Sequence, residues 1–292
     1  MIIDTKPNRK RPRRQPRILT ESGYIDMLQA IMHPDAVYRY SIWAVALPLA
    51  ACGIGAALLM GITVERVFPA SLRRRHDALT AAILSVVGLT FGVLLAFVAM
   101  LAWERFDAAQ TAASREATVL LDLHGIAAAL PEPERTDLRE SFIAYARAVR
   151  EVEWPDQAAG RVVQASNPPL DRADTIVTGL RPPDIGVGNL QAALIAGLAR
   201  LRDARDGRRS AAESQIPPVI WFVLISGGGM TLMCAALLGT SDLRLHLAMT
   251  SLLSLSGVLV LVMIVALGHP FQGDLRITPK AFAGVEEEMG GR

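Results

Sequence analysis

Four long uncharged stretches dominate the pattern of hydrophobic and polar positions along this chain. They cover 41–64, 78–103, 217–240 and 247–268, and charged residues return between them. Each stretch is longer than the roughly 18 apolar residues that cross a hydrocarbon core about 30 Å thick. The pattern therefore predicts four transmembrane helices, rather than four buried helices of a soluble protein.

The polar region 104–216, between the second and third stretches, has the three- and four-residue spacing of amphipathic helices. No turn residue interrupts Trp103-Glu104-Arg105, so we expect the second transmembrane helix to continue into water as one helix. The segment LPEPE at 130–134 should end it, because proline starts a helix but does not continue one. Residues 155–188 are rich in Pro and Gly and should hold at most one short helix. The predicted apolar stripes are Phe106, Ala109, Ala113, Ala117, Leu120 and His124; Leu138, Phe142, Tyr145, Val149 and Val152; and Leu190, Leu194, Leu198 and Leu201.

These segments predict an all-α polytopic membrane protein with a helical cytoplasmic region inserted between spans 2 and 3. Four spans place both termini and the inserted region on one side of the bilayer. Lys and Arg near the span ends are more numerous on that side, which the positive-inside rule assigns to the cytoplasm. The run RRRH in the loop 65–77 argues the other way.

The expected divisions are a basic tail and short helix at 1–40, spans 1 and 2 at 41–103, the cytoplasmic helical region at 104–216, spans 3 and 4 at 217–268, and a cytoplasmic C-terminal tail at 269–292.

Composition agrees with a membrane protein, since 51% of residues are hydrophobic and 20% are charged. The formal net charge of +2 gives no reason to expect a nucleic-acid partner. The segment 6–17, KPNRKRPRRQPR, carries only basic charges, and is either a solvated tail or a tether to anionic lipid headgroups. Cys52 and Cys234 both fall inside predicted spans, where we expect packing residues rather than a disulfide or a metal pair.

The sequence contains no recognisable catalytic motif. A phosphate-binding glycine loop, GxSxG, HExxH and CxxC are all missing, and the histidines are scattered. No acid or base lies in the middle of a span, where a proton relay or a coupled transporter would place one. We therefore expect no enzyme, no cofactor and no metal site. The acidic run Glu286-Glu287-Glu288 is expected to be solvated.

The second span carries two features of functional interest. Gly88 and Gly92 form a GxxxG motif that lets helices approach closely, either within one subunit or between subunits. Leu89, Val93 and Phe97 recur every four residues and share one face of the helix. A ring of such large apolar side chains can close a narrow pore by expelling water. The alternative is that these three residues face lipid or pack in a core.

Hydroxyl groups gather on the fourth span, at Thr250 and Ser254. They could face a pore and line a path for water. The alternative is that they hydrogen-bond to carbonyl groups of their own helix, as Ser and Thr in helices commonly do.

Two segments, LAWERFDAAQTAASREATVLL at 101–121 and 243–282, resemble a widespread bacterial family of unknown function that is called bestrophin-like. The resemblance covers about 75–285 and implies a bacterial inner-membrane protein. A weaker resemblance extends to the bestrophin anion channels. It rests on the apolar stretch from Gly88 to Phe97, on Trp103, Glu104, Arg105 and Phe106, and on Pro270, Phe271, Gly273 and Asp274 after the fourth span.

The weaker resemblance implies that Leu89, Val93 and Phe97 fall where bestrophins place an apolar neck. Two differences from the bestrophins limit which of their properties the resemblance implies for this chain. Val98-Ala99-Met100 stands where bestrophins have polar residues, and the acidic run that binds calcium in animal bestrophins is missing. The resemblance therefore implies neither anion selectivity nor calcium gating for this chain.

Two functions remain open on the sequence. The first is a homo-oligomeric ion channel in the lipid bilayer that conducts inorganic ions. The second is a membrane-anchored interaction or sensory protein without transport activity. The number of subunits separates them, because a ring of identical subunits can enclose a pore and a monomer cannot.

Overall fold

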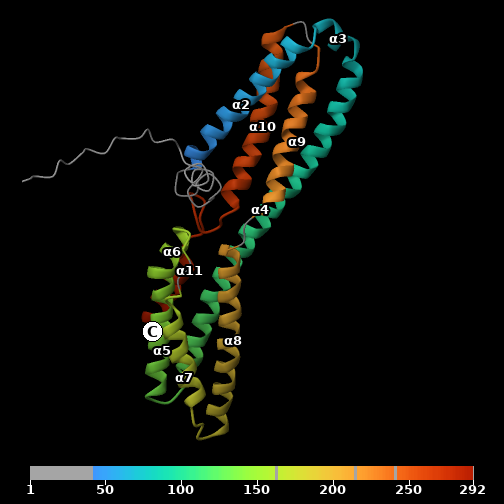
Figure 1. The fold of residues 1–292 in the computed structure, drawn as a ribbon. Helices are drawn as coiled ribbons and strands as arrows, with labels where there is room; N and C mark the ends of the chain where they lie inside the picture. The colour runs from blue at the N-terminus through green and yellow to red at the C-terminus, as the bar shows by residue number, and fades with distance from the viewer. Residues whose placement is uncertain (1–41, 162–163, 214–215, 240–241, 292) are drawn as a thin grey trace, which may run out of the picture. The chain divides into compact units, whose positions relative to one another are not determined.

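The computed structural model describes residues 42–161, 164–213, 216–239 and 242–291. Within these residues every regular element is helical, as the sequence predicts. The basic segment 6–17 and the short helix expected within 1–40 lie outside the described residues. Figure 1 gives the order of the helices along the chain.

The four predicted spans are confirmed as four helices long and apolar enough to cross a membrane: α2 (Ile42–Val67), the first part of α4 (Asp77–Ala127), α9 (Pro218–Ala236) and α10 (Leu243–Leu267). The short helix α3 (Ala70–Arg75) lies between α2 and α4. α10 packs on α2, and α4 packs on α9. Between 11% and 33% of the most apolar window of each span is buried inside the protein. Most of the apolar surface therefore faces outward, where lipid replaces water as the solvent.

Local sequence sets where the last two membrane helices begin. α9 starts at Pro218, since a proline in the first turn lacks only an amide that would have no helical partner. α10 follows Asp242, whose carboxylate accepts hydrogen bonds from the amides of Arg244 and Leu245 at 2.9 and 3.3 Å. This cap satisfies amide groups that a helix leaves free at its N-terminus.

The continuity of α4 across the membrane boundary is confirmed. It is one helix of 51 residues, about 75 Å long at the usual helical rise. Its first half is apolar up to Trp103, and its second half belongs to a bundle of helices outside the apolar layer (Figure 1). Gly125 does not stop the helix, which ends at Ala127 just before the predicted proline-rich break.

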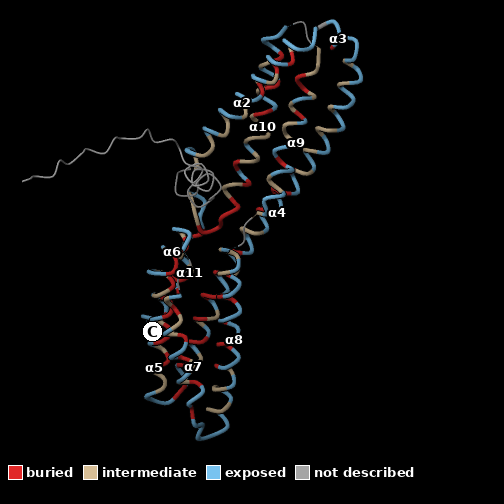
Figure 2. Tube along the Cα trace, in the orientation of Figure 1, coloured by how far each residue is buried: buried red, intermediate tan, exposed pale blue. Residues whose placement is uncertain are grey.

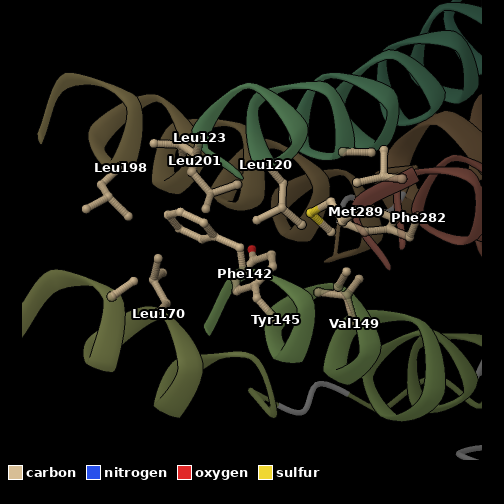
Figure 3. Packing of buried hydrophobic residues seen from close by; sticks show 14 of the residues in the cluster. Leu120, Leu123, Phe142, Tyr145, Val149, Leu170, Leu198, Leu201, Phe282 and Met289 are labelled. Carbon is tan, nitrogen blue, oxygen red and sulfur yellow. The ribbon is translucent and has the colours of Figure 1, made fainter. Parts of the chain in front are cut away.

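The inserted region folds as a helical bundle around the polar half of α4. Figure 2 shows buried positions along the sides of its helices that face one another. Its core includes Leu120, Phe142, Tyr145, Leu198 and Phe282, seen from close by in Figure 3. The other members are α5 (Glu134–Ala148), η2 (Val149–Glu153), α6 (Trp154–Ala158), α7 (Asn167–Gly179), α8 (Ile185–Glu213) and α11 (Lys280–Gly290).

The predicted apolar stripe that runs from Leu138 to Val152 is wrong at its last residue. Val149 is buried as expected, but Val152 is 43% exposed and Glu153 takes the buried position. The cause is the π-helical turn η2 over Val149–Glu153. A π-turn adds a residue to the helical repeat, so the inward position moves one residue along the chain.

Three further expectations need correction. The stretch 155–188 holds the 13-residue helix α7 together with most of α6 and the start of α8, and so is more ordered than its composition suggests. The segment 269–292, expected to be a tail, contributes α11 to the bundle, where Phe282 and Met289 are buried against α4 and α5. Glu286 was expected to be solvated, but it lies within ion-pair distance of Arg147 and Arg150.

Candidate functional site

The three residues of the predicted neck lie on the outside of α4. Leu89, Val93 and Phe97 are 71%, 48% and 67% exposed. Such exposure excludes the alternative in which they pack in the core that the described residues form. They face either lipid or another copy of the protein.

The same face of α4 stays exposed on both sides of the membrane boundary. Steps of three or four residues keep a row of positions on one side of a helix. Continuing from Phe97, the row passes from apolar side chains to charged and hydroxyl side chains just after Trp103. Its exposed members are Leu79, Val86, Leu89, Val93, Phe97, Met100, Glu104, Asp107, Thr111 and Arg115. We call this row the open face of α4.

An open groove of about 460 Å³ runs beside the polar part of the open face. It lies between α4 and α8, which pack together along the bundle. Ala204 and Gly207 of α8 form part of its wall, and their small size keeps it wide. Its charged and hydroxyl lining consists of Glu104, Asp107, Thr111, Arg115 and Asp203.

The GxxxG glycines do not pack within the described chain. A Cβ atom added at Gly88 or Gly92 would meet nothing within 4 Å. The close crossings are at other glycines that the sequence did not single out. A Cβ at Gly53 would come within 2.6 Å of Val258, and one at Gly61 within 2.6 Å of Leu247, both on α10. Packing at Gly88 and Gly92 therefore stays a prediction about a second copy of the chain.

The predicted pore-facing hydroxyls point into the protein. Thr250 and Ser254 are 5% and 6% exposed. The Thr250 hydroxyl donates to the carbonyl of His246 at 3.0 Å, and the Ser254 hydroxyl lies 3.0 Å from the position of a Cβ on Gly53 of α2. Both residues belong to the contact between α2 and α10, away from the open face of α4. The structure thus contradicts the pore-facing interpretation for this chain, and Thr250 follows the alternative of bonding to its own helix.

The motif at the membrane boundary divides its residues between two sides of α4. Phe106 is half-buried and contacts the cores of both the membrane helices and the bundle. Trp103 is 58% exposed and stacks on Phe106, with 6.4 Å between ring centroids. Glu104 lies on the open face, and Arg105 is half-buried.

The motif after α10 joins the membrane helices to the bundle. Phe271 is 2% exposed and meets the Trp154 ring edge-on at 5.4 Å. The amide of Ile277 donates to the carbonyl of Pro270 at 2.8 Å, and a positive φ of 74° at Gly273 permits the turn between them. Asp274 accepts a hydrogen bond from the amide of Ile42 at 2.7 Å, which caps the start of α2.

A buried ionic network, which the sequence reasoning missed, lies inside the bundle. Arg208 is fully buried and donates to Glu116 at 2.6 and 3.2 Å and to Glu153 at 2.9 Å. The Tyr145 hydroxyl donates to Glu116 at 2.7 Å, and the Ser166 hydroxyl donates to Glu153 at 2.7 Å. The network ties α4, α5, η2 and α8 together through partners far apart in the sequence.

The network shifts the pKa values of its members. Burial alone would raise the pKa of Glu153, but hydrogen bonds from Ser166 and Arg208 and the Arg208 charge outweigh it, so that the pKa lies below its usual value. Burial and the Glu116 charge raise the pKa of Tyr145 well above its usual value. Desolvation disfavours the charge on Arg208, but Glu116 more than offsets it, and the pKa of Arg208 lies above its usual value.

A signal for this network exists in the sequence. Glu116 lies three residues after Ala113 and four before Leu120, on the predicted apolar stripe of α4. Arg205 and Arg208 likewise continue the spacing of Leu194, Leu198 and Leu201 along α8. Charged residues at stripe positions on two helices indicate a buried ion pair, because an unpaired buried charge is too costly.

In the part of the chain that the structure describes, no three His, Cys, Asp or Glu side chains are placed to hold a metal ion. The fold and the exposed apolar helices define a polytopic α-helical membrane protein. The family model of the Bestrophin-like domain matches residues 51–282, so the chain belongs to the Bestrophin-like family. A comparison with curated protein sequences finds no match.

Solved structures resemble this fold closely. A single-substitution variant of a bacterial Bestrophin homolog from Klebsiella pneumoniae has a TM-score of 0.65 at 15% identity, covering 85% of this chain and 98% of that one. The structure of that homolog solved by zinc phasing has a TM-score of 0.62 at 16% identity, covering 83% and 98%. Identities this low establish a shared fold alone.

Proposed function

We propose that this protein is an ion channel in which several copies surround an axis and the open face of α4 lines the pore. The observation that carries the proposal is the continuity of this face. One helix presents an unpartnered row of side chains that is apolar from Leu79 to Met100 and polar from Glu104 onward. Membership of the Bestrophin-like family, and the resemblance to bestrophin anion channels, support the same conclusion.

The positions next to the neck are consistent with a neighbouring subunit. Gly88 and Gly92 lie beside Leu89 and Val93 on α4, and a Cβ added at either glycine would meet nothing within 4 Å in the described chain. Small residues let the backbones of two membrane helices approach closely. A neighbouring copy seated on these glycines turns Leu89, Val93 and Phe97 toward the axis. Their ring would then hold the pore shut by excluding water.

We also propose that the protein sits in the bacterial inner membrane with both termini and the bundle in the cytoplasm. The loop between α2 and α4 carries several arginines that argue against this orientation. Arg73, however, is only 4% exposed, pairs with Glu65 and donates to the carbonyl of Leu238 at 3.2 Å. Its charge is neutralised inside the protein, which weakens the argument for a cytoplasmic loop.

The proposal is tested by ion flux through the purified protein in liposomes. Leu89→Ala, Val93→Ala and Phe97→Ala together should widen the neck and raise the flux above that of the wild type. A matched control replaces three other exposed apolar residues on membrane helices, Leu59, Ile225 and Leu252, which are 69%, 67% and 68% exposed. This control should leave the flux unchanged, because these residues face lipid.

Negligible flux through both the wild type and the triple variant, with protein folded and inserted, would contradict the channel. A monomer in detergent would contradict the ring. Either result would favour the alternative, a membrane-anchored interaction or sensory protein without transport activity.

A further inference from the structure

We propose that the two short segments that join the membrane helices in pairs form a binding surface for the headgroups of anionic phospholipids. One segment joins α2 to α4 and contains α3, and the other joins α9 to α10. The groups that bind the headgroups are four arginines, which we call the basic cluster: Arg66, Arg74, Arg75 and Arg244. The proposal requires only that the four spans cross a membrane, so it is independent of ion conduction and of the orientation.

Two contacts hold the joining segments together. Arg73 of α3 pairs with Glu65 of α2 and donates to the carbonyl of Leu238, just after α9, at 3.2 Å. The carboxylate of Asp77, the first residue of α4, accepts a hydrogen bond from the amide of Gly239 at 2.6 Å. Each segment joins two spans, so its residues lie at a face of the membrane. The contacts therefore gather the basic cluster at one face of the membrane.

The carboxylates of these segments already have partners within the protein. Glu65 pairs with Arg73, Asp77 binds the amide of Gly239, and Asp242 caps α10 through two backbone amides. All four arginines of the basic cluster are exposed. Among the described residues, none of their side chains has a partner in an ion pair or a hydrogen bond. The surface thus carries four positive charges that no described side chain neutralises.

Exposed apolar side chains lie next to these charges along the chain. Val67 is 62% exposed and Leu72 is 45% exposed, and Leu243 and Leu245 are 40% and 59% exposed. Each lies within two residues of an arginine of the basic cluster. A surface that combines basic and apolar side chains is typical of segments at the boundary between lipid and water. The apolar side chains reach the acyl chains, and the long arginine side chains extend their charged ends to the headgroups.

The chemistry of the basic cluster favours a phosphate with net negative charge. A guanidinium group is planar, and its fork of N–H donors matches the oxygens of a phosphate. Phospholipids carry a phosphate at the depth where these segments lie. An anionic headgroup leaves that charge unbalanced, whereas a zwitterionic headgroup cancels it with its own cation. Each basic residue near an anionic lipid surface strengthens binding about fivefold.

The test is a titration of the detergent-solubilised protein with phosphatidylglycerol or with phosphatidylcholine of the same acyl chains, followed by native mass spectrometry. The wild type should bind phosphatidylglycerol more tightly. Changing all four arginines of the basic cluster to Gln should reduce this preference on the order of a hundredfold. Changing them to Lys should preserve most of it, because the charge remains. The control changes four exposed arginines of the bundle to Gln and should preserve the preference; these are Arg172, Arg181, Arg200 and Arg202.

Each of the other outcomes would overturn the proposal. Equal binding of the two lipids by the wild type, or a preference that the four Gln changes leave intact, would remove the basic cluster from lipid binding. Millimolar inorganic phosphate that displaces phosphatidylglycerol would indicate a general anion site instead. A changed oligomer mass with an unchanged lipid preference would indicate a contact between copies of the chain. A thermal melt of the Gln variant that matches the wild type ensures that lost binding reports on charge and not on misfolding.

Discussion

Arg208 of α8 and Glu116 of α4 form a fully buried ion pair, with two hydrogen bonds of 2.6 and 3.2 Å, at the centre of the helical bundle. The pair joins residues 92 positions apart in the chain. Glu116 belongs to the half of α4 outside the apolar layer, and the other half of α4 is the second membrane span. The pair therefore holds α8 against α4 in the part of the bundle that contains the groove beside the open face of α4.

Removing Arg208 should destabilise the bundle strongly. Arg208→Met leaves the carboxylates of Glu116 and Glu153 buried without their main partner, and breaking a buried pair costs about 3–5 kcal/mol. Denaturant unfolding of the purified protein, followed by tryptophan fluorescence, measures the loss. Arg172→Met is the control, because its pair with Asp137 is exposed on both sides and should be worth about 0–1 kcal/mol. Equal stability of the two variants would contradict the role of the network.

The network should also make stability depend on acid. The pKa of Glu153 is lowered in the folded protein, so the unfolded chain binds its proton more readily. Its contribution is therefore fully present above the ordinary carboxyl pKa, about 4.3, and is lost as pH falls through the lower folded value. Melting temperatures measured from pH 7 down to pH 3 should fall at the acidic end. Glu153→Gln should flatten that fall, and an unchanged slope would argue against a charged, hydrogen-bonded Glu153.

Phe142 should be one of the most sensitive core positions. It is 1% exposed among the bundle helices (Figure 3), whereas Phe222 on α9 is 72% exposed on a membrane helix. Phe142→Ala should cost about 3–5 kcal/mol of unfolding free energy, because a large side chain leaves a cavity. Phe222→Ala should cost far less, since lipid fills the space. A thermal melt of each variant compares them, and a tolerant Phe142 would mean that the core is loosely packed.

The glycines of α4 and α2 should respond differently to added bulk. Gly88→Leu should leave each chain folded but weaken assembly, because no described residue of its own chain comes within 4 Å of the new Cβ. Gly53→Leu should instead disturb the chain itself, since Val258 would lie within 2.6 Å of the new Cβ. Mass measurement of the detergent-solubilised particles, together with a melt, distinguishes the two effects. An unchanged oligomer for Gly88→Leu would remove this glycine from the subunit interface.

The orientation in the membrane can be read from cysteine labelling in intact cells, after Cys52 and Cys234 are replaced. Ser71 on α3 and Ser210 on α8 are both exposed. α3 lies between the membrane helices α2 and α4, whereas α8 belongs to the bundle around the other half of α4 (Figure 1). A cysteine at Ser71 should react with an impermeant reagent added outside, and one at Ser210 should react only after lysis. Ser141 is unsuitable, because at 2% exposure a cysteine there would stay silent from either side. The reverse labelling pattern would invert the topology.

Features set by near neighbours in the sequence could be predicted well. The four spans, the unbroken α4 and the stripe of Ala109, Ala113 and Ala117 all follow from local apolar spacing. The break at LPEPE follows from the chemistry of proline. In each case the physical cause lies within one or two helical turns, so a single sequence carries the information.

Features set by distant partners could not be predicted in the same way. The burial of Glu116 depends on Arg208, and the packing of α11 depends on Trp154, which meets Phe282 at 5.8 Å. The π-turn that moves burial from Val152 to Glu153 has no sequence pattern of its own. Gly88 and Gly53 look alike in the sequence, yet only the fold shows that α10 packs against Gly53 and that no described residue packs against Gly88.

The central claim is that the open face of α4 meets water in a pore rather than lipid. The most direct measurement is ion flux through a Phe97→Cys variant, free of other cysteines, before and after a charged thiol reagent is added on the bundle side. Modification should change the flux strongly, because the reagent reaches a pore-lining thiol. Leu252→Cys, at a position of α10 that is 68% exposed and that we expect to face lipid, should show no change. A Phe97→Cys protein whose flux is as indifferent to the reagent as that of Leu252→Cys would contradict the account.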